Sequence, residues 1–184
     1  MKTTVRAVLT DVSPEHDNIL TNMMKAFCSA VRYSFNRLLE PVKIGELEKA
    51  VAAKYNLNIR QAKDAVEEAR QTIASQRELV QLNYDNYTKK AQAAEKTLKS
   101  KKLSKRRRKA LEMKLDKRKR KQAYYKKYID TGTISTVIFG TKAMFVKRCK
   151  GLISKEEWQA ARDNRIYSRG DKTKSGNPNL RIIS

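Results

Sequence analysis

The chain has 184 residues, which suits one domain or two small ones with a modest hydrophobic core. Its 42 Lys and Arg outnumber 19 Asp and Glu, and the net charge of +23 opposes compaction unless a polyanion is bound. There is no apolar stretch of about 18 residues and no apolar core of a signal peptide, so the sequence predicts a cytoplasmic protein without a membrane segment.

The first elements are predicted to be a strand and a helix. Residues 2–10 alternate in the period of a β-strand, which needs a partner strand elsewhere in the chain. Ser13 and Pro14 have the order of a helix N-cap and first helical residue. The apolar residues of 20–38 recur at helical spacing, and Pro41 marks the end of this helix.

The middle of the chain is predicted to be helical. Residues 46–131 form a run of 86 residues without Gly or Pro, the two main helix breakers. Asn residues at 56–58 can end one helix and cap the next. A second break is expected at 100–104, with Ser104 as N-cap, so that two arms fold back as an antiparallel hairpin at about 80–130.

This hairpin is strongly basic. Residues 89–127 hold nineteen Lys or Arg against three acids, which favours binding to a nucleic-acid backbone. A solvated helical face or a disordered basic tail is the alternative. The apolar seam is thin, with Ala91 and Ala94 on one arm and interruptions by Arg118 and Gln122 on the other, so we expect the tip to order against its ligand. The candidate phosphate-binding residues here are Lys105, Arg106, Arg107, Arg108, Lys109, Lys117, Arg118, Lys119, Arg120 and Lys121.

The C-terminal part is predicted to contain two more strands and a short helix. Gly132 ends the helical block, and the β-branched run at 133–139 predicts a strand. Ser154 starts a capping-box helix, and 180–183 look like the first half of a third strand. The predicted fold is therefore α+β, predominantly α, with a small incomplete sheet that carries a long helical insertion, as in the N-terminal portion of something longer.

Aromatic residues interleaved with bases also favour nucleic acid, because rings stack on unpaired bases while cations hold phosphates. Tyr124 and Tyr125 beside Lys126 show this pattern. Core anchoring is the alternative for Phe35 and Trp158. The other candidates are Arg32, Tyr33 and Asn36, then Arg162 and Arg165, and the loop residues Tyr167, Ser168, Arg169, Lys172 and Lys174, whose cations and backbone amides can grip phosphates.

No catalytic or metal site is predicted. No cluster of carboxylates suits a two-metal nuclease, and His16 has no partner at catalytic spacing. Cys28 and Cys149 lie far apart without a CxxC motif, which supports neither a zinc site nor a disulfide framework. We expect the chain alone to cut no DNA and to need no cofactor.

Several segments together resemble the N-terminal part of TnpB proteins, the transposon-encoded RNA-guided nucleases related to type V CRISPR effectors. The resemblance rests on the first strand, 31–38, 137–148 and 156–172, the last two being the most specific. Phe35-Asn36 stands where the family often has Tyr-Asn. The resemblance adds Lys142 and Arg148 to the candidate nucleic-acid-binding residues.

The resemblance implies a wedge-like β-barrel made of residues 1–12 and 132–184, interrupted by a helical recognition lobe at 13–131. It implies guide RNA and target DNA as partners. It places Mg²⁺, Zn²⁺ and DNA cleavage in a RuvC-like part that these residues do not include, so the chain would be its non-cleaving portion. The alternative is a freestanding basic helical RNA-binding protein, ribosome-associated or structural, without a nuclease role. The oligomeric state stays open.

Overall fold

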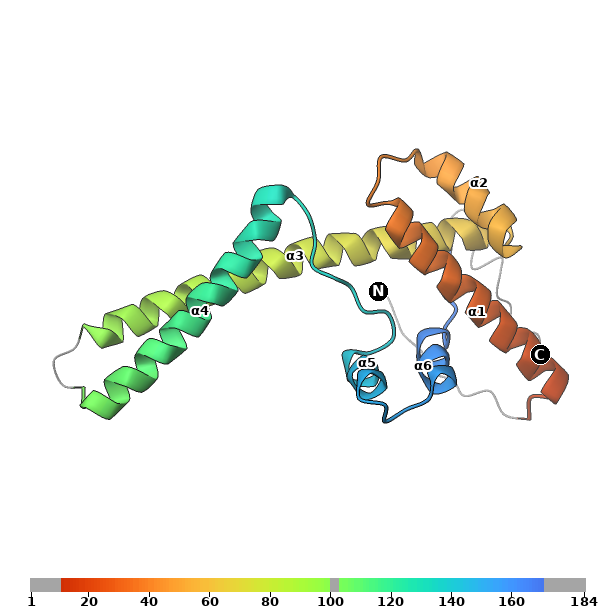
Figure 1. Ribbon diagram of the computed structural model, residues 1–184. Coiled ribbons are helices and arrows are strands. Elements are labelled where there is room, and N and C mark those ends of the chain that lie inside the picture. Colours follow the sequence, from red (N-terminus) through yellow and green to blue (C-terminus); the bar gives the residue numbers. More distant parts are fainter. Residues whose placement is uncertain (1–10, 100–102, 171–184) are drawn as a thin grey trace. The chain divides into compact units, whose positions relative to one another are not determined.

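A computed structural model describes residues 11–99 and 103–170, and this part of the chain contains six helices (Figure 1). They are α1 (Pro14–Arg37), α2 (Ile44–Tyr55), α3 (Ile59–Leu98), α4 (Lys105–Thr131), α5 (Lys142–Cys149) and α6 (Lys155–Arg162). The chain divides into two compact units. Unit 1 comprises Met1–Arg70 and Ile138–Ser184, and unit 2 comprises Gln71–Val137, so that α3 contributes to both.

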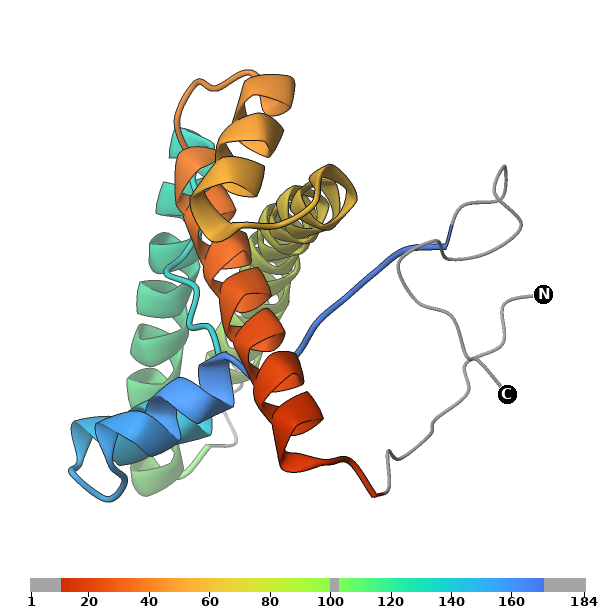
Figure 2. The same cartoon turned by 90° about the vertical axis from the view of Figure 1, so that its right-hand side faces the viewer.

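Unit 1 holds the larger apolar core. Helix α1 packs against α2, and the first turns of α3 lie beside them (Figure 2). Phe27 and Val31 of α1, Val51 of α2 and Val66 of α3 are almost completely buried. Phe35 packs edge-on against Phe139, with ring centroids 5.3 Å apart. The helical spacing of these residues explains why each helix turns one face inward.

The predicted helix boundaries are confirmed by their capping groups. The Ser13 and Ser104 side chains accept hydrogen bonds from the third backbone amides of α1 and α4. Asn56 ends α2 in the left-handed conformation, at φ 51°. Asn58 Oδ1 accepts from the Gln61 amide at 2.8 Å, and Gly132 ends α4 at φ 63°. Each cap satisfies backbone groups that a helix end leaves without partners.

Two short helices follow in unit 1. Helix α6 starts with the predicted capping box, in which Ser154 and Glu157 bond each other's backbone amides. Helix α5, which sequence reasoning did not predict, is capped by Thr141. Gly140 precedes it at φ 82°, and a Cβ there would lie 3.2 Å from the Trp158 ring. The close packing and the positive φ together require glycine at this position.

The predicted small β-barrel is wrong for the part of the chain that the structure describes. Residues 133–139, predicted as a strand, form no sheet and connect α4 to α5 as irregular chain. Their β-branched composition is not sufficient, because a strand needs a hydrogen-bonding neighbour. The predicted strands at 2–10 and 180–183 lie outside the described residues. Within 11–99 and 103–170, no helix combines the length and apolar character needed to cross a lipid bilayer.

Candidate nucleic-acid interface

The interface candidate is the helical hairpin of unit 2, made of the second part of α3 and of α4. Along α4, half-buried side chains recur every three or four residues, at Arg108, Leu111, Leu115, Arg118, Gln122, Tyr125 and Tyr128. No residue of α4 is buried. On α3 the buried residues of this unit are Ile73, Val80, Ala91 and Ala94. The thin seam predicted from the sequence is therefore present.

Polar groups hold much of this seam together. Arg118 Nη1 donates to the Lys90 carbonyl oxygen at 2.8 Å, and Arg108 Nη1 donates to the Leu98 carbonyl oxygen at 3.1 Å. Gln122 Nε2 donates to Thr88 Oγ1 at 2.8 Å. These acceptors are neutral, so the positive charge of both arginines remains uncompensated by them. The residues that interrupt the apolar pattern thus replace apolar contact with hydrogen bonds across the hairpin.

Few acids neutralise the outer surface of α4. Glu95 lies 2.6 Å from Lys119, and this contact lowers the pKa of the Glu95 carboxyl below its ordinary value. Asp116 pairs with Arg120 at 2.6 Å. Among the described residues, several predicted phosphate-binding cations of this helix have no ion pair. These are Lys105, Arg106, Arg107, Lys109, Lys117 and Lys121.

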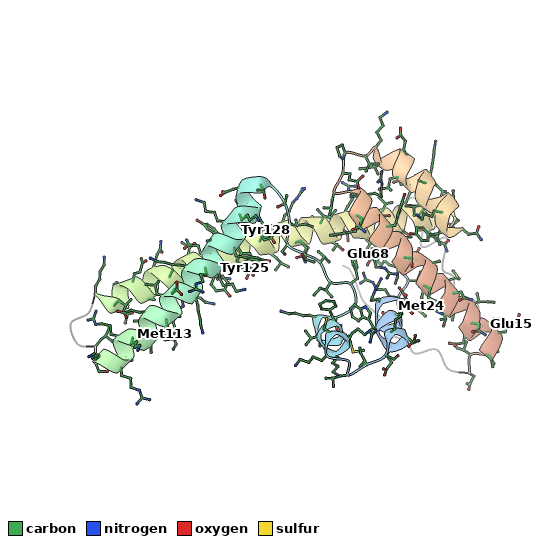
Figure 3. All side chains as sticks on the ribbon, viewed as in Figure 1. Glu15, Met24, Glu68, Met113, Tyr125 and Tyr128 are labelled. Carbon is green, nitrogen blue, oxygen red and sulfur yellow. The ribbon has the colours of Figure 1, made fainter. Side chains whose placement is uncertain are left out.

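A cluster of four tyrosines lies at the C-terminal end of α4, with three rings from α4 and one from α3. The ring of Tyr125 stacks on that of Tyr87 of α3 at 5.8 Å, with an interplanar angle of 18°. Tyr124 meets both Tyr125 and Tyr128 edge-on at 5.2 Å. The Tyr128 hydroxyl donates to that of Tyr124, and this bond raises the pKa of Tyr128. Tyr125 and Tyr128 are labelled on the last turns of α4 in Figure 3.

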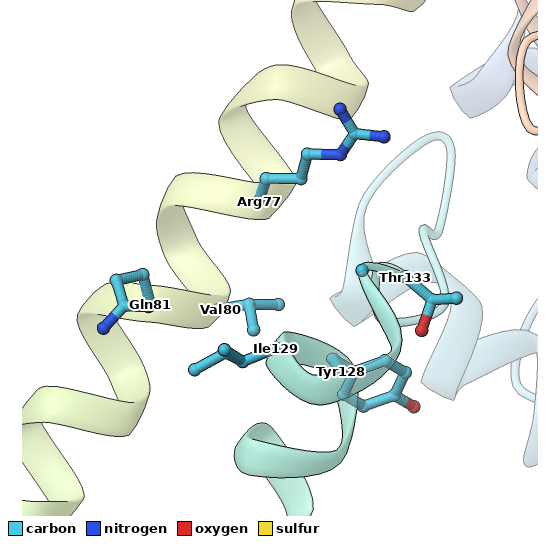
Figure 4. Close-up of a pocket in the computed structure, with 7 residues that line it drawn as sticks. Arg77, Val80, Gln81, Tyr128, Ile129 and Thr133 are labelled. Carbon is cyan, nitrogen blue, oxygen red and sulfur yellow. The ribbon is translucent and has the colours of Figure 1, made fainter.

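A pocket of about 310 Å³, which we call the hairpin pocket, lies next to this tyrosine cluster and shares Tyr128 with it. Its lining includes Arg77 and Val80 from α3, and Tyr128 and Ile129 from α4 (Figure 4). Gln81, Gly132 and Thr133 complete the lining. Every lining residue belongs to unit 2. No periodic pattern in the sequence predicts this pocket, because it forms where the C-terminal end of α4 meets α3.

Several candidates of unit 1 pair with acids from the same unit. Arg32 Nη1 lies 2.6 Å from Asp163 Oδ1 and also donates to the Arg162 carbonyl oxygen at 3.2 Å. Arg165 pairs with Glu68. Arg169 donates to the buried Asp64 through its Nε, at 2.9 Å, and through its backbone amide, at 3.2 Å. These contacts tie the segment after α6 to α1 and α3.

The other candidates of unit 1 lie on scattered surfaces. Tyr33 packs against Tyr55 under the Lys54 ammonium, and Arg162 lies over the Trp158 ring at 5.8 Å. Trp158 also contacts Phe145, but Trp158 is only half-buried and no residue of α6 belongs to the buried core. The remaining described candidates are the exposed Asn36, Lys142 in the first turn of α5, Arg148, which donates to the Ile153 carbonyl oxygen, the exposed Tyr167, and Ser168. Lys172 and Lys174 lie outside the described residues.

The described residues contain no group of three or more His, Cys, Asp or Glu that could hold a metal ion. Cys28 is buried and donates its thiol to the Arg165 carbonyl oxygen at 3.1 Å, whereas Cys149 is exposed. His16 packs in the first turn of α1, where its Nδ1 lies 2.9 Å from the Ser13 hydroxyl. These three residues therefore have ordinary structural surroundings.

Over the described residues, the fold defines a basic α-helical protein with a long two-helix hairpin. The chain belongs to the family of the SSO2105 N-terminal domain, whose sequence profile matches residues 2–184. No curated protein matches the chain, and no solved structure does. This family match does not test the resemblance to TnpB proteins, which stays a prediction.

Proposed function

We propose that the chain binds nucleic acid through the hairpin of α3 and α4, chiefly by contacts to the phosphate backbone. The observation that carries this proposal is a set of α4 cations that have no ion pair among the described residues, namely Lys105, Arg106, Arg107, Lys109, Lys117 and Lys121. Like charges one helical turn apart repel and destabilise a helix. A polyanion removes that repulsion, whereas water and salt only reduce it.

The weak seam supports the same proposal. The hairpin buries little apolar area, since Ala91 and Ala94 provide much of the α3 side of its seam. Binding phosphates across both helices would stabilise the closed hairpin by favouring the state that aligns its cations. If α4 were only a solvated helical face, its cations would gain nothing from a lack of matching acids, because acids nearby would reduce their mutual repulsion.

The resemblance extends the proposal to a more specific function. We propose a cytoplasmic guide-RNA and target-DNA-binding portion of a TnpB-like, transposon-associated nuclease, with metal-dependent cleavage carried by residues outside this chain. Segments 137–148 and 156–172 support it. A freestanding basic RNA-binding protein is the second candidate, which the lack of any metal-binding cluster in the described residues also allows.

The salt dependence of binding tests the general proposal. If the hairpin neutralises about six to eight phosphates, log K should fall against log salt with a slope of roughly −4 to −7. Replacing Arg106, Arg107, Lys109, Lys117 and Lys121 with Gln avoids the seam and should flatten the slope by about 3.5 on single strands. The matched control removes five exposed charges from unit 1, at Lys25, Lys49, Lys63, Lys147 and Lys150. Equal slopes in the two variants would overturn the hairpin as the binding surface.

The RNA that co-purifies with the chain separates the two specific candidates. A guide-binding protein should retain a small set of non-ribosomal RNAs with one common segment and one variable segment. A ribosome-associated protein should retain ribosomal RNA. Sequencing the bound RNA after a high-salt wash gives this answer, and ribosomal RNA alone would contradict the TnpB-like proposal.

A further inference from the structure

One face of α4 changes from cationic to aromatic along its length. This face carries residues spaced by three, four or seven positions, which therefore lie on the same side of the helix. We call its cations the basic stripe (Arg107, Lys114, Lys117 and Lys121) and its two rings the tyrosine end (Tyr124 and Tyr128). The Lys121 ammonium lies 5.4 Å from the centre of the Tyr124 ring. A strand that follows the stripe from the hairpin tip would meet cations first and rings afterwards.

Tyr124 is the ring of the tyrosine cluster best placed to accept another ring. Tyr125 is half-buried and already stacks face to face on Tyr87. Tyr124 is 45% exposed, while its edge contacts with Tyr125 and Tyr128 fix its orientation. A fixed and exposed aromatic ring can stack on a base at little entropic cost.

The hairpin pocket continues this surface, because Tyr128 belongs both to the tyrosine end and to the pocket wall. Its volume of about 310 Å³ lies at the lower end of the range for small-molecule sites, roughly 300–1,000 Å³. The C-terminal end of α4 lies here, and the partial negative charge of a helix C-terminus disfavours phosphate. A neutral ring suits the pocket better, because its lining combines the apolar Val80 and Ile129 with the polar Arg77 and Thr133.

We propose that the tyrosine end of the hairpin binds unpaired bases, one stacked on Tyr124 and the next in the hairpin pocket. The proposal rests on the proposed nucleic-acid binding and adds to it a preference for single-stranded segments. Bases within a duplex have both faces covered, so they can neither stack on Tyr124 nor enter the pocket. Duplex and single strand share only the phosphate contacts of the basic stripe.

Binding of one labelled RNA oligonucleotide, alone and annealed to its complement, tests this inference with the full chain at fixed salt. Tyr124→Leu should weaken binding to the single strand by roughly 5- to 150-fold, the effect of losing one stacked base, and should change duplex binding less than twofold. Tyr124→Phe is the matched control, since it keeps the ring and loses only the hydroxyl contact to Tyr128. A DNA strand of the same sequence shows whether the ribose hydroxyl contributes.

A second readout needs no variant. A single 2-aminopurine in the RNA strand should lose fluorescence when it stacks on the wild-type protein. Loss of salt-dependent binding to both strands would overturn the proposed function itself. Normal salt-dependent binding with equal effects of Tyr124→Leu on both ligands, or unchanged 2-aminopurine fluorescence at every position tried, would overturn the base-binding inference alone.

Discussion

Arg169 shows how a residue that looks functional in the sequence can have a structural partner. Its guanidinium and its backbone amide both donate to Asp64, whose side chain is only 3% exposed. The hydrogen bond that Arg169 donates to Asp64 raises the pKa of Arg169, so its guanidinium stays charged at any pH near neutral. A buried carboxylate needs this compensation, because an unpaired buried charge is strongly unfavourable.

We therefore expect Arg169→Ala to destabilise unit 1. The change leaves the Asp64 carboxylate buried without its cation, which should lower the free energy of unfolding by about 1–3 kcal/mol. Both variants keep the backbone amide contact to Asp64, and Arg169→Lys should cost less because it also keeps the positive charge. Urea unfolding followed by Trp158 fluorescence measures both. An unchanged midpoint in Arg169→Ala, together with weaker RNA binding, would instead support the phosphate-binding role predicted from the sequence.

Glu95 and Lys119 give the hairpin a dependence on acid. Their contact lowers the pKa of Glu95 below the ordinary value of 4.5, so the folded state favours the ionised carboxylate. Its contribution to stability is present above the unfolded-state pKa and disappears as the pH falls through the lower folded-state pKa. The hairpin should therefore melt at a lower temperature at pH 3 than at pH 6, measured by circular dichroism. Glu95→Gln should show a smaller difference between the two pH values; identical acid sensitivity would exclude this pair as a cause.

At the scale of elements, Arg118 lies where the helical pattern of α4 would place an apolar residue. It donates to a backbone carbonyl within α3, a group that a helix interior already supplies with an amide partner. Replacing it with Leu loses one modest hydrogen bond, removes one repelling charge and buries apolar area. The hairpin should gain about 1 kcal/mol.

Thermal melting of Arg118→Leu beside Arg120→Leu checks this expectation, since Arg120 is exposed on the same helix. Only the first variant should raise the melting temperature of unit 2. A lower melting temperature for Arg118→Leu would show that the bond to Lys90 stabilises the hairpin more than apolar contact can.

The ends of the long helices could be predicted from the sequence, whereas the conformation of residues 133–149 could not. Ser13, Asn58, Ser104 and Ser154 cap helices through contacts within three residues, so their signals are local. The strand predicted at 133–139 failed because β-structure depends on a distant neighbour. Helix α5 was missed because its short length leaves little periodicity to read.

The same distinction applies to the candidate interface. Charge density along the sequence located the basic hairpin, since its cations are neighbours in the chain. It could not show which arginines pair with acids, because Arg165 and Glu68 are 97 positions apart and Arg169 and Asp64 are 105 apart. The hairpin pocket also needed the fold, because its walls come from two helices.

At the scale of the whole chain, the two units differ in what stabilises them. Large side chains such as Phe27, Val51 and Val66 are buried in unit 1, whereas the described residues buried in unit 2 are Ile73, Val80, Ala91 and Ala94. Apolar burial is the main favourable contribution to folding. Unit 2 should therefore be the less stable of the two.

Unfolding should accordingly occur in two steps. Trp158, the single tryptophan, reports on unit 1, whereas helical circular dichroism reports on both units. The dichroism should begin to fall at lower urea than the tryptophan signal changes. Single-stranded RNA at 100 times its Kd should stabilise only the first step, by about 2.7 kcal/mol. Coincident transitions without RNA would show that α3 couples the units into one cooperative structure.

The polar seam also determines how precisely the two arms of the hairpin are aligned lengthwise. Backbone carbonyls recur at every residue of α3, so the bonds from Arg108 and Arg118 would be equally possible one turn along, about 5.4 Å away. The Gln122–Thr88 bond and the stacking of Tyr125 on Tyr87 involve particular side chains and so choose one register. The alignment of the basic tip is thus set near the tyrosines, several turns away from the cations that it positions.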